Sequence, residues 1–258
     1  MKKEQEKKSG IPLVIIGIVF VAVVALAYVW YSSSDSSQKT AGKPAARPSR
    51  ASQPTANVPP GASLGTNVIG SPTAAVTVEE FADFQCGACA AVHPTMKEIQ
   101  QIYGSRIRFI FRNFPLAIPA HDKAYEAAAA AEAAAMQGKF WPMQDRLFRG
   151  QQEWSTNQNY KQLWADYATA LGMDAERFKA DMAGLQAKSR VDEDRKRGLG
   201  MNVSSTPSVY VNGVLVPYPE LSTQALRRII DAELQQAAAA KSEASSASGT
   251  ESNVAGRE

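Results

Sequence analysis

The sequence of 258 residues contains only two cysteines and two histidines. A zinc site made of such side chains usually needs four ligands, so this shortage leaves little room for one. The cysteines, Cys86 and Cys89, are separated by two residues, and a disulfide between them would close a very short loop. Cross-links over short loops stabilise a fold least, so the pair indicates chemistry rather than structural cross-linking.

The sequence also lacks a large excess of charge of one sign, since its formal net charge is +3. Its densest charged run, residues 188–197, mixes basic and acidic side chains. This mixture is typical of a solvated helix face and not of a phosphate-binding patch. We therefore expect no nucleic-acid partner.

Long apolar runs are absent except for one, residues 11–31, which contains no charged residue. About 20 such residues cross the ~30 Å hydrocarbon core of a bilayer. Residues 1–10 carry four lysines and are expected to stay in the cytoplasm. The alternative is a cleaved signal peptide, because Ala25-Leu26-Ala27 resembles a cleavage site. However, the apolar run is longer than the ~7–15 apolar residues usual for a signal peptide. We favour an uncleaved single-pass anchor with the remaining chain outside the cytoplasm.

Two segments have few large apolar residues. Residues 32–64 are rich in Ser, Ala and Pro and predict a disordered tether, and residues 239–258 predict a disordered tail. The part expected to fold is therefore one domain, residues 65–238.

Within this domain the pattern predicts the order β-α-β, a helical insertion at about residues 115–200, and then β-β-α. Asn212-Gly213 between two apolar runs is a strong signal for a hairpin turn. The predicted elements before the insertion are a strand at 75–83, a helix at 87–103 broken or bent at Pro94, and a strand at 106–112. The insertion is predicted to contain a helix at 123–137, a short helix that starts at Pro142, and helices at 160–171 and 174–197, the last interrupted near Gly184. Strands at 208–211 and 214–216 and a last helix from Ser222 follow.

The predicted strand and helix around the cysteines place Cys86 at a helix N-terminus. Free N–H groups and the helix dipole stabilise a thiolate there, which makes it a better leaving group and its disulfide more oxidising. Two other interpretations stay open: metal binding by Cys86, Cys89 and His93, and an inert buried pair. We interpret His93 and His121 as structural residues.

Four motifs together resemble the DsbA-like branch of the thioredoxin fold, in which a helical domain is inserted into an α/β fold. The resemblance covers roughly residues 65–235. The motifs are Phe81-Ala82-Asp83-Phe84-Gln85-Cys86-Gly87-Ala88-Cys89, Phe111-Arg112-Asn113-Phe114-Pro115-Leu116, Gly138-Lys139-Phe140-Trp141 and Thr206-Pro207-Ser208-Val209-Tyr210-Val211-Asn212-Gly213.

The resemblance implies a role for each of five residues. Cys86 would be the nucleophile that forms mixed disulfides, and Cys89 would resolve them. Pro207 would be a cis-proline opposite the cysteines, and the Thr206 backbone would pair with a substrate strand. Glu80 matches a buried acid that could relay the proton of Cys89, although the adjacent Glu79 could be the inward-facing residue instead.

The resemblance also implies an extracytoplasmic thiol–disulfide oxidoreductase that acts on exported proteins containing cysteines, with a membrane redox partner. We expect no cofactor besides the redox-active disulfide Cys86–Cys89, and no metal. The dipeptide Gly87-Ala88 replaces the Pro-His of strongly oxidising members, which favours a less oxidising site and leaves the direction of electron flow open. The absence of an added dimerisation module favours an oxidase. The alternatives are a reductase or isomerase fed by a membrane donor, a metal-binding chaperone, and a peptide-binding module without redox activity.

Overall fold

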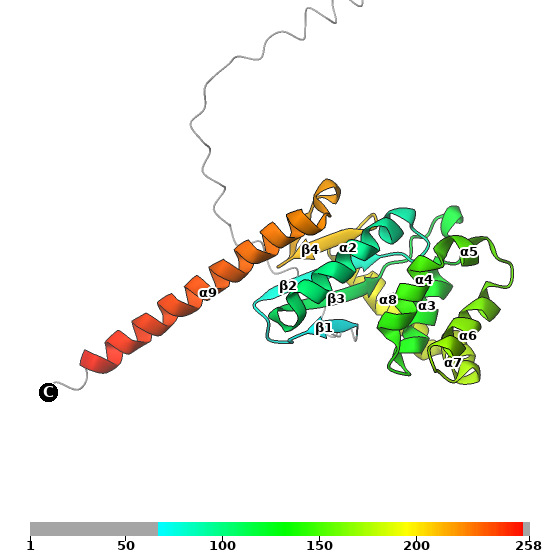
Figure 1. Ribbon diagram of the computed structural model, residues 1–258, viewed down its shortest axis with the longest axis horizontal. Coiled ribbons are helices and arrows are strands. Elements are labelled where there is room, and N and C mark those ends of the chain that lie inside the picture. The colour runs from blue at the N-terminus through cyan, green and yellow to red at the C-terminus, as the bar shows by residue number, and fades with distance from the viewer. Residues whose placement is uncertain (1–66, 255–258) are drawn as a thin grey trace, which may run out of the picture. The chain divides into compact units, whose positions relative to one another are not determined.

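A mixed five-stranded sheet forms the centre of the computed structural model, which describes residues 67–254 (Figure 1). Its strand order is β1-β3-β2-β4-β5; β2 and β3 are parallel, and the other neighbouring pairs are antiparallel. The strands are β1 (Val68–Gly70), β2 (Val76–Ala82), β3 (Ile107–Asn113), β4 (Ser208–Val211) and β5 (Val214–Val216). The sequence predicted all of them except β1. The thioredoxin-like α/β fold is therefore confirmed.

The predicted cytoplasmic segment, anchor and tether lie outside the described residues. Within residues 67–254, no helix combines the length and the apolar character needed to cross a bilayer.

The central strand β2 is buried on both faces. Val78 and Ala82 belong to the main hydrophobic core together with Cys89. Phe81, whose side chain points to the opposite face, belongs to a second cluster with Phe114. A strand covered on both sides holds the residues that follow it in a fixed position, and the cysteines follow β2 directly.

The cysteine helix α2 (Gly87–Tyr103) is continuous through Pro94, where the sequence predicted a break or bend. Its buried side chains include Cys89, Met96 and Ile99. At its other end the Tyr103 hydroxyl donates a hydrogen bond of 2.8 Å to a carboxylate of helix α9 (Thr223–Val254). The core and this contact together fix the axis of α2.

The helical insertion lies between β3 and β4, as predicted, and α3 to α7 gather beside the sheet (Figure 1). Trp154 and Trp164 are fully buried in it, with ring centroids 5.3 Å apart. The inserted helices are α3 (Ala124–Ala135), α4 (Phe140–Arg149), α5 (Gln151–Thr156), α6 (Tyr160–Ala170), α7 (Ala175–Ala183) and α8 (Leu185–Gly200).

Helix α8 packs against the sheet face that carries Phe81. A Cβ atom added at Gly198 would lie 2.5 Å from the Phe114 ring, so only glycine permits this close approach. Three short 3-10 helices, η1 (Gly104–Arg106), η2 (Pro119–His121) and η3 (Tyr218–Glu220), complete the connections.

A buried ion-pair network joins β2, β3 and α8. Arg112 donates to Glu79 at 2.8 Å and to Asp194 at 3.0 Å, and Arg197 donates to Glu79 at 2.6 Å. Asp194 is 1% exposed. The expectation of a wholly solvated helix face for residues 188–197 is therefore wrong at Asp194, because the fold brings Arg112 beneath it.

The C-terminal part confirms the predicted hairpin and differs at the tail. Asn212 and Gly213 both have positive φ, at 48° and 77°, as a type I′ turn requires. Helix α9 continues to Val254, past residue 239, where the composition predicted a disordered tail. Among residues 239–254 the alanines, Lys241, Glu243 and Glu251 are good helix formers, so part of this composition suits a helix.

Candidate active site

Cys86 is the N-cap residue of α2 and has an extended backbone, with φ −75° and ψ 119°. Its carbonyl oxygen accepts the first helical hydrogen bond, from the Ala90 N–H at 3.1 Å. This conformation turns the Cys86 sulfur toward the free N–H groups of the first helical turn. The sequence thus placed Cys86 correctly, and both cysteines are free thiols in this structure.

The two thiols differ strongly in acidity. A hydrogen bond from the Cys89 thiol, with help from the N–H groups of Cys89 and Ala88, lowers the pKa of Cys86 to about 5. Burial raises the pKa of Cys89, and the negative charge on Cys86 raises it further. Cys86 is 8% exposed, whereas Cys89 has no exposed surface. At neutral pH the site therefore holds one slightly exposed thiolate and one fully buried thiol.

The loop before β4 meets the cysteines across the fold. The Cys86 Sγ lies 3.4 Å from the Thr206 carbonyl oxygen, to which its protonated form donates, although 120 residues separate them in the sequence. The following bond, Thr206–Pro207, is cis, as the resemblance implied. The structure thus brings Cys86, Cys89, Thr206 and Pro207 together at one end of the sheet.

Glu79 and Glu80 are both buried, on opposite faces of β2. Glu79 faces the ion-pair network with Arg112 and Arg197. Glu80 shares the face of Val78 and therefore points to the side of the sheet where α2 and Cys89 lie. Burial raises the pKa of Glu80 to about 8, so its carboxyl group is mainly neutral at pH 7. The structure places Glu80, not Glu79, on the cysteine side.

A set of side chains holds the turn between β2 and α2. Buried Asp83 accepts hydrogen bonds from the Gln85 N–H at 2.7 Å and the Leu116 N–H at 2.8 Å. His121 Nδ1 lies 2.7 Å from the same carboxylate. His121 is thus a structural residue of this turn, in agreement with its interpretation from the sequence.

Gln151 is the site residue that sequence reasoning missed. Its side-chain amide donates to the carbonyl oxygens of Phe84, at 2.7 Å, and Cys86, at 3.0 Å. A side chain that bonds to backbone 65 residues away leaves no local sequence pattern, so only the folded structure could identify it.

His93 does not join the cysteines. Its Nε2 atom lies 3.0 Å from Asp145, and its ring stacks at 4.8 Å from Phe148. Across residues 67–254, no three His, Cys, Asp or Glu side chains gather in a way that could hold a metal ion. The residues proposed for metal binding therefore do not form a ligand set in the part of the chain that the structure describes.

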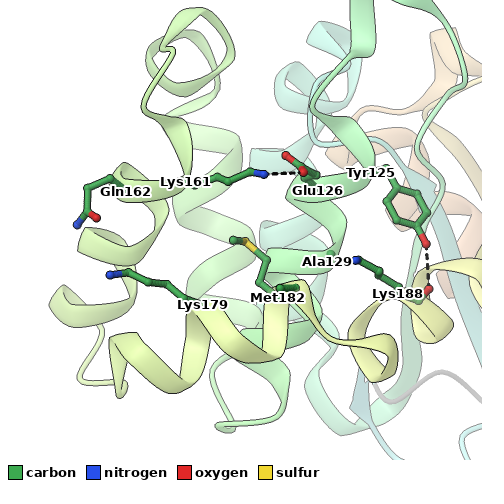
Figure 2. A pocket seen from close by; sticks show the side chains of 9 residues that line it. Tyr125, Glu126, Ala129, Lys161, Gln162, Lys179, Met182 and Lys188 are labelled. Atoms are coloured by element: carbon green, nitrogen blue, oxygen red, sulfur yellow. Dashed lines mark hydrogen bonds and ion pairs between the residues drawn. The ribbon is translucent and has the colours of Figure 1, made fainter.

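A separate hollow of about 430 Å³ lies between α3, α6, α7 and α8 (Figure 2). Lys161 lies at its edge and pairs with Glu126 at 2.8 Å, and Met182 projects into it (Figure 2). None of its lining residues belongs to the cysteine cluster. We therefore place the candidate active site at Cys86, where the acidic thiol and the loop before β4 come together.

Comparison with known proteins agrees with this geometry. A family model described as Thioredoxin matches residues 62–232. BdbD from Bacillus subtilis, solved in its oxidised form, is 24% identical; the similarity covers 66% of this chain and 92% of that one, with a TM-score of 0.57. A thioredoxin-like oxidoreductase from Silicibacter pomeroyi is also 24% identical, covering 64% of this chain and 89% of that one, with a TM-score of 0.53. These structures share the fold.

Among curated proteins, a similar one is the Na(+)/H(+) antiporter NhaA 1 of Mycolicibacterium gilvum, 36% identical over 149 residues. The match covers 57% of this chain but only 23% of the antiporter. It relates one segment of that protein to this chain, and we transfer no transport activity from it.

Proposed function

This chain belongs to the thioredoxin family, and we propose that it is a DsbA-like thiol–disulfide oxidoreductase that exchanges disulfides in exported proteins. The observation that carries the proposal is the asymmetry of the cysteine pair. Cys86 is a slightly exposed thiol with its pKa lowered to about 5, and Cys89 is a fully buried thiol with its pKa raised. A thiolate is the reactive form in disulfide exchange. The pair itself is the redox group, so the reaction needs no bound cofactor.

Oxidation of a substrate would proceed in two exchange steps. A substrate thiolate attacks the Cys86 sulfur of the Cys86–Cys89 disulfide; a mixed disulfide forms and Cys89 leaves as a thiolate. A second substrate thiolate then attacks the substrate sulfur of the mixed disulfide, and Cys86 leaves as a thiolate. The substrate loses two electrons and two protons, and the cysteine pair gains the two electrons, which a membrane redox partner then accepts.

Glu80 is proposed as the group that moves the proton of Cys89. When Cys89 leaves as a thiolate, its raised pKa favours rapid protonation. With its own pKa raised to about 8, Glu80 carries a proton at pH 7 and lies on the same side of the sheet. A buried carboxyl group of this kind can act as general acid in one direction and general base in the other.

Thr206 and Pro207 are proposed to hold the substrate. The Thr206 carbonyl lies 3.4 Å from Cys86 Sγ, so a segment that pairs with this backbone would have its cysteine beside the thiolate. Addition of an extended segment to exposed backbone is a common mode of peptide recognition. It depends on main-chain groups and would accept substrates of varied sequence.

The acidity of Cys86 favours oxidation over reduction. Reactive cysteines of this fold range in pKa from about 7 in thioredoxin to about 3.5 in DsbA, and the value of about 5 for Cys86 lies between them. Stabilising the thiolate stabilises the reduced pair, which makes the disulfide a stronger oxidant. We propose an oxidase of intermediate strength; a reductase or isomerase fed by a membrane donor is the alternative.

We place the catalytic domain outside the cytoplasm, tethered to the membrane by residues 11–31. The proposal rests on the length and apolar character of that run and on the chemistry, because disulfides persist in oxidising compartments. Protease added to spheroplasts should remove the domain and leave a small membrane-bound fragment. Full protection of the domain, or a mature N-terminus just after Ala27, would contradict the anchored topology.

The enzymatic proposal is tested with the purified chain and a reduced, unfolded protein that contains cysteines. The oxidised chain should form disulfides in this substrate at a rate that falls to the uncatalysed level in Cys86→Ala. Equal rates for the wild-type chain and this variant would reject the proposed activity.

A further inference from the structure

Gln151 occupies a position from which it controls the backbone of the reactive cysteine. Its Nε2 group has two N–H bonds, and it donates to two carbonyl oxygens, of Phe84 at 2.7 Å and of Cys86 at 3.0 Å. These carbonyls bracket the turn that leads from β2 into α2. One amide group therefore fixes both ends of the turn on the side facing the helical insertion.

The Cys86 carbonyl oxygen already accepts the first helical hydrogen bond, from Ala90 at 3.1 Å. The orientation of this carbonyl is set by ψ of Cys86, which is 119°. A second donor on the oxygen restricts rotation about ψ. The same rotation decides whether the N–H groups of Ala88 and Cys89, which lower the pKa of Cys86, point at its sulfur.

Gln151 is itself held firmly, because it is the first residue of α5. Three residues later in α5, Trp154 is fully buried, and its Nε1 donates to the Leu147 carbonyl at 2.7 Å. The adjacent Gln152, by contrast, is exposed. The amide of Gln151 thus connects a rigid part of the insertion to the active-site turn.

We propose that Gln151 is a positioning residue that sets the acidity and redox equilibrium of Cys86 through its two hydrogen bonds to the turn. This proposal rests on the proposed function, because it assigns a role within the same reaction. Under this proposal the helical insertion has a second role besides covering the sheet, because it supplies the side chain that orients the nucleophile Cys86.

The test compares Gln151→Ala, Gln151→Met and the matched control Gln152→Ala in the full chain. Gln151→Met keeps much of the side-chain length but has no N–H, so it separates the hydrogen bonds from packing. In the reduced chain, the thiolate absorbance of Cys86 is followed against pH. Loss of these hydrogen bonds should raise the pKa of Cys86 by about half to one unit in both Gln151 variants and leave Gln152→Ala at the wild-type value.

The equilibrium of the pair with glutathione provides a second measurement. A less stable thiolate destabilises the reduced pair, so both Gln151 variants should favour the oxidised form by about three- to tenfold. Circular dichroism verifies that each variant is folded. A folded Gln151→Met chain with the wild-type pKa and equilibrium would overturn the proposal. The titration of Cys86 uses no protein substrate, so its result does not depend on the proposed function. If the chain failed to oxidise a substrate, the proposed function would be rejected, whereas a raised pKa of Cys86 in the Gln151 variants would still support the role of Gln151.

Discussion

Replacing Glu80 by glutamine should stabilise the protein, and the gain should grow with pH. Glu80 is 1% exposed, and its Oε2 atom has no hydrogen-bond partner among the described residues. Burial raises its pKa from 4.5 to about 8. The folded state therefore holds a proton that the unfolded state releases between these two values, and stability falls as pH rises through this window.

The size of the effect follows from the shift. Each pKa unit corresponds to about 1.4 kcal/mol, so the wild-type chain should lose on the order of 5 kcal/mol between pH 4.5 and pH 8 through this group. Glutamine has the shape of the neutral acid and does not ionise. The difference in unfolding free energy between Glu80→Gln and wild type should be small near pH 5 and approach about 5 kcal/mol near pH 8.

Urea unfolding of both reduced chains at several pH values measures this difference. The titration of Cys86 affects both proteins equally and cancels in the comparison. Glu220→Gln, at an exposed position of η3, serves as the matched control. A difference between Glu80→Gln and wild type that stays constant from pH 5 to pH 9 would refute the assignment of Glu80 as a buried, protonated acid.

Three further predictions concern the site and its support. Brief alkylation at about pH 6 should label Cys86 before Cys89, because only Cys86 has a lowered pKa; peptide mass spectrometry showing Cys89 labelled first would reverse the assignment. Pro207→Ala should slow substrate release, because Pro207 adjoins the Thr206 backbone beside Cys86, and mixed disulfides should accumulate on non-reducing gels. Turnover at the native rate without trapped complexes would show that Pro207 is not part of the active site. Arg112→Ala should lower the urea unfolding free energy by about 3–5 kcal/mol, since it removes the arginine that pairs with buried Asp194 and one of the two arginines that pair with buried Glu79; a loss below about 1 kcal/mol would show that the ion pairs contribute little.

The sequence predicted those parts of the fold that depend on neighbouring residues. The Asn212-Gly213 turn has a local requirement for positive φ, and the helix after Cys86 follows from the apolar spacing of Val92, Met96 and Ile99. Strand β1 was missed because its three residues are too few to show a periodic pattern.

The contacts that sequence reasoning missed join residues far apart in the chain. Asp194 looked like one more charge in a solvated helix, since its partner Arg112 lies 82 residues away. Nothing in the local sequence distinguishes Gln151 from Gln152, and only the fold shows that its amide reaches the turn at Cys86. The two cysteines were identified because their spacing itself carries the chemistry.

The most direct test of the account is to trap the exchange intermediate in cells. A Cys89→Ala chain keeps the nucleophile but cannot resolve a mixed disulfide. We predict that it accumulates complexes with exported proteins, which reductant releases and which disappear in the double variant Cys86→Ala/Cys89→Ala. If Cys89→Ala trapped no exported protein, or if Cys86→Ala trapped them instead, the proposed disulfide exchange through Cys86 would be wrong.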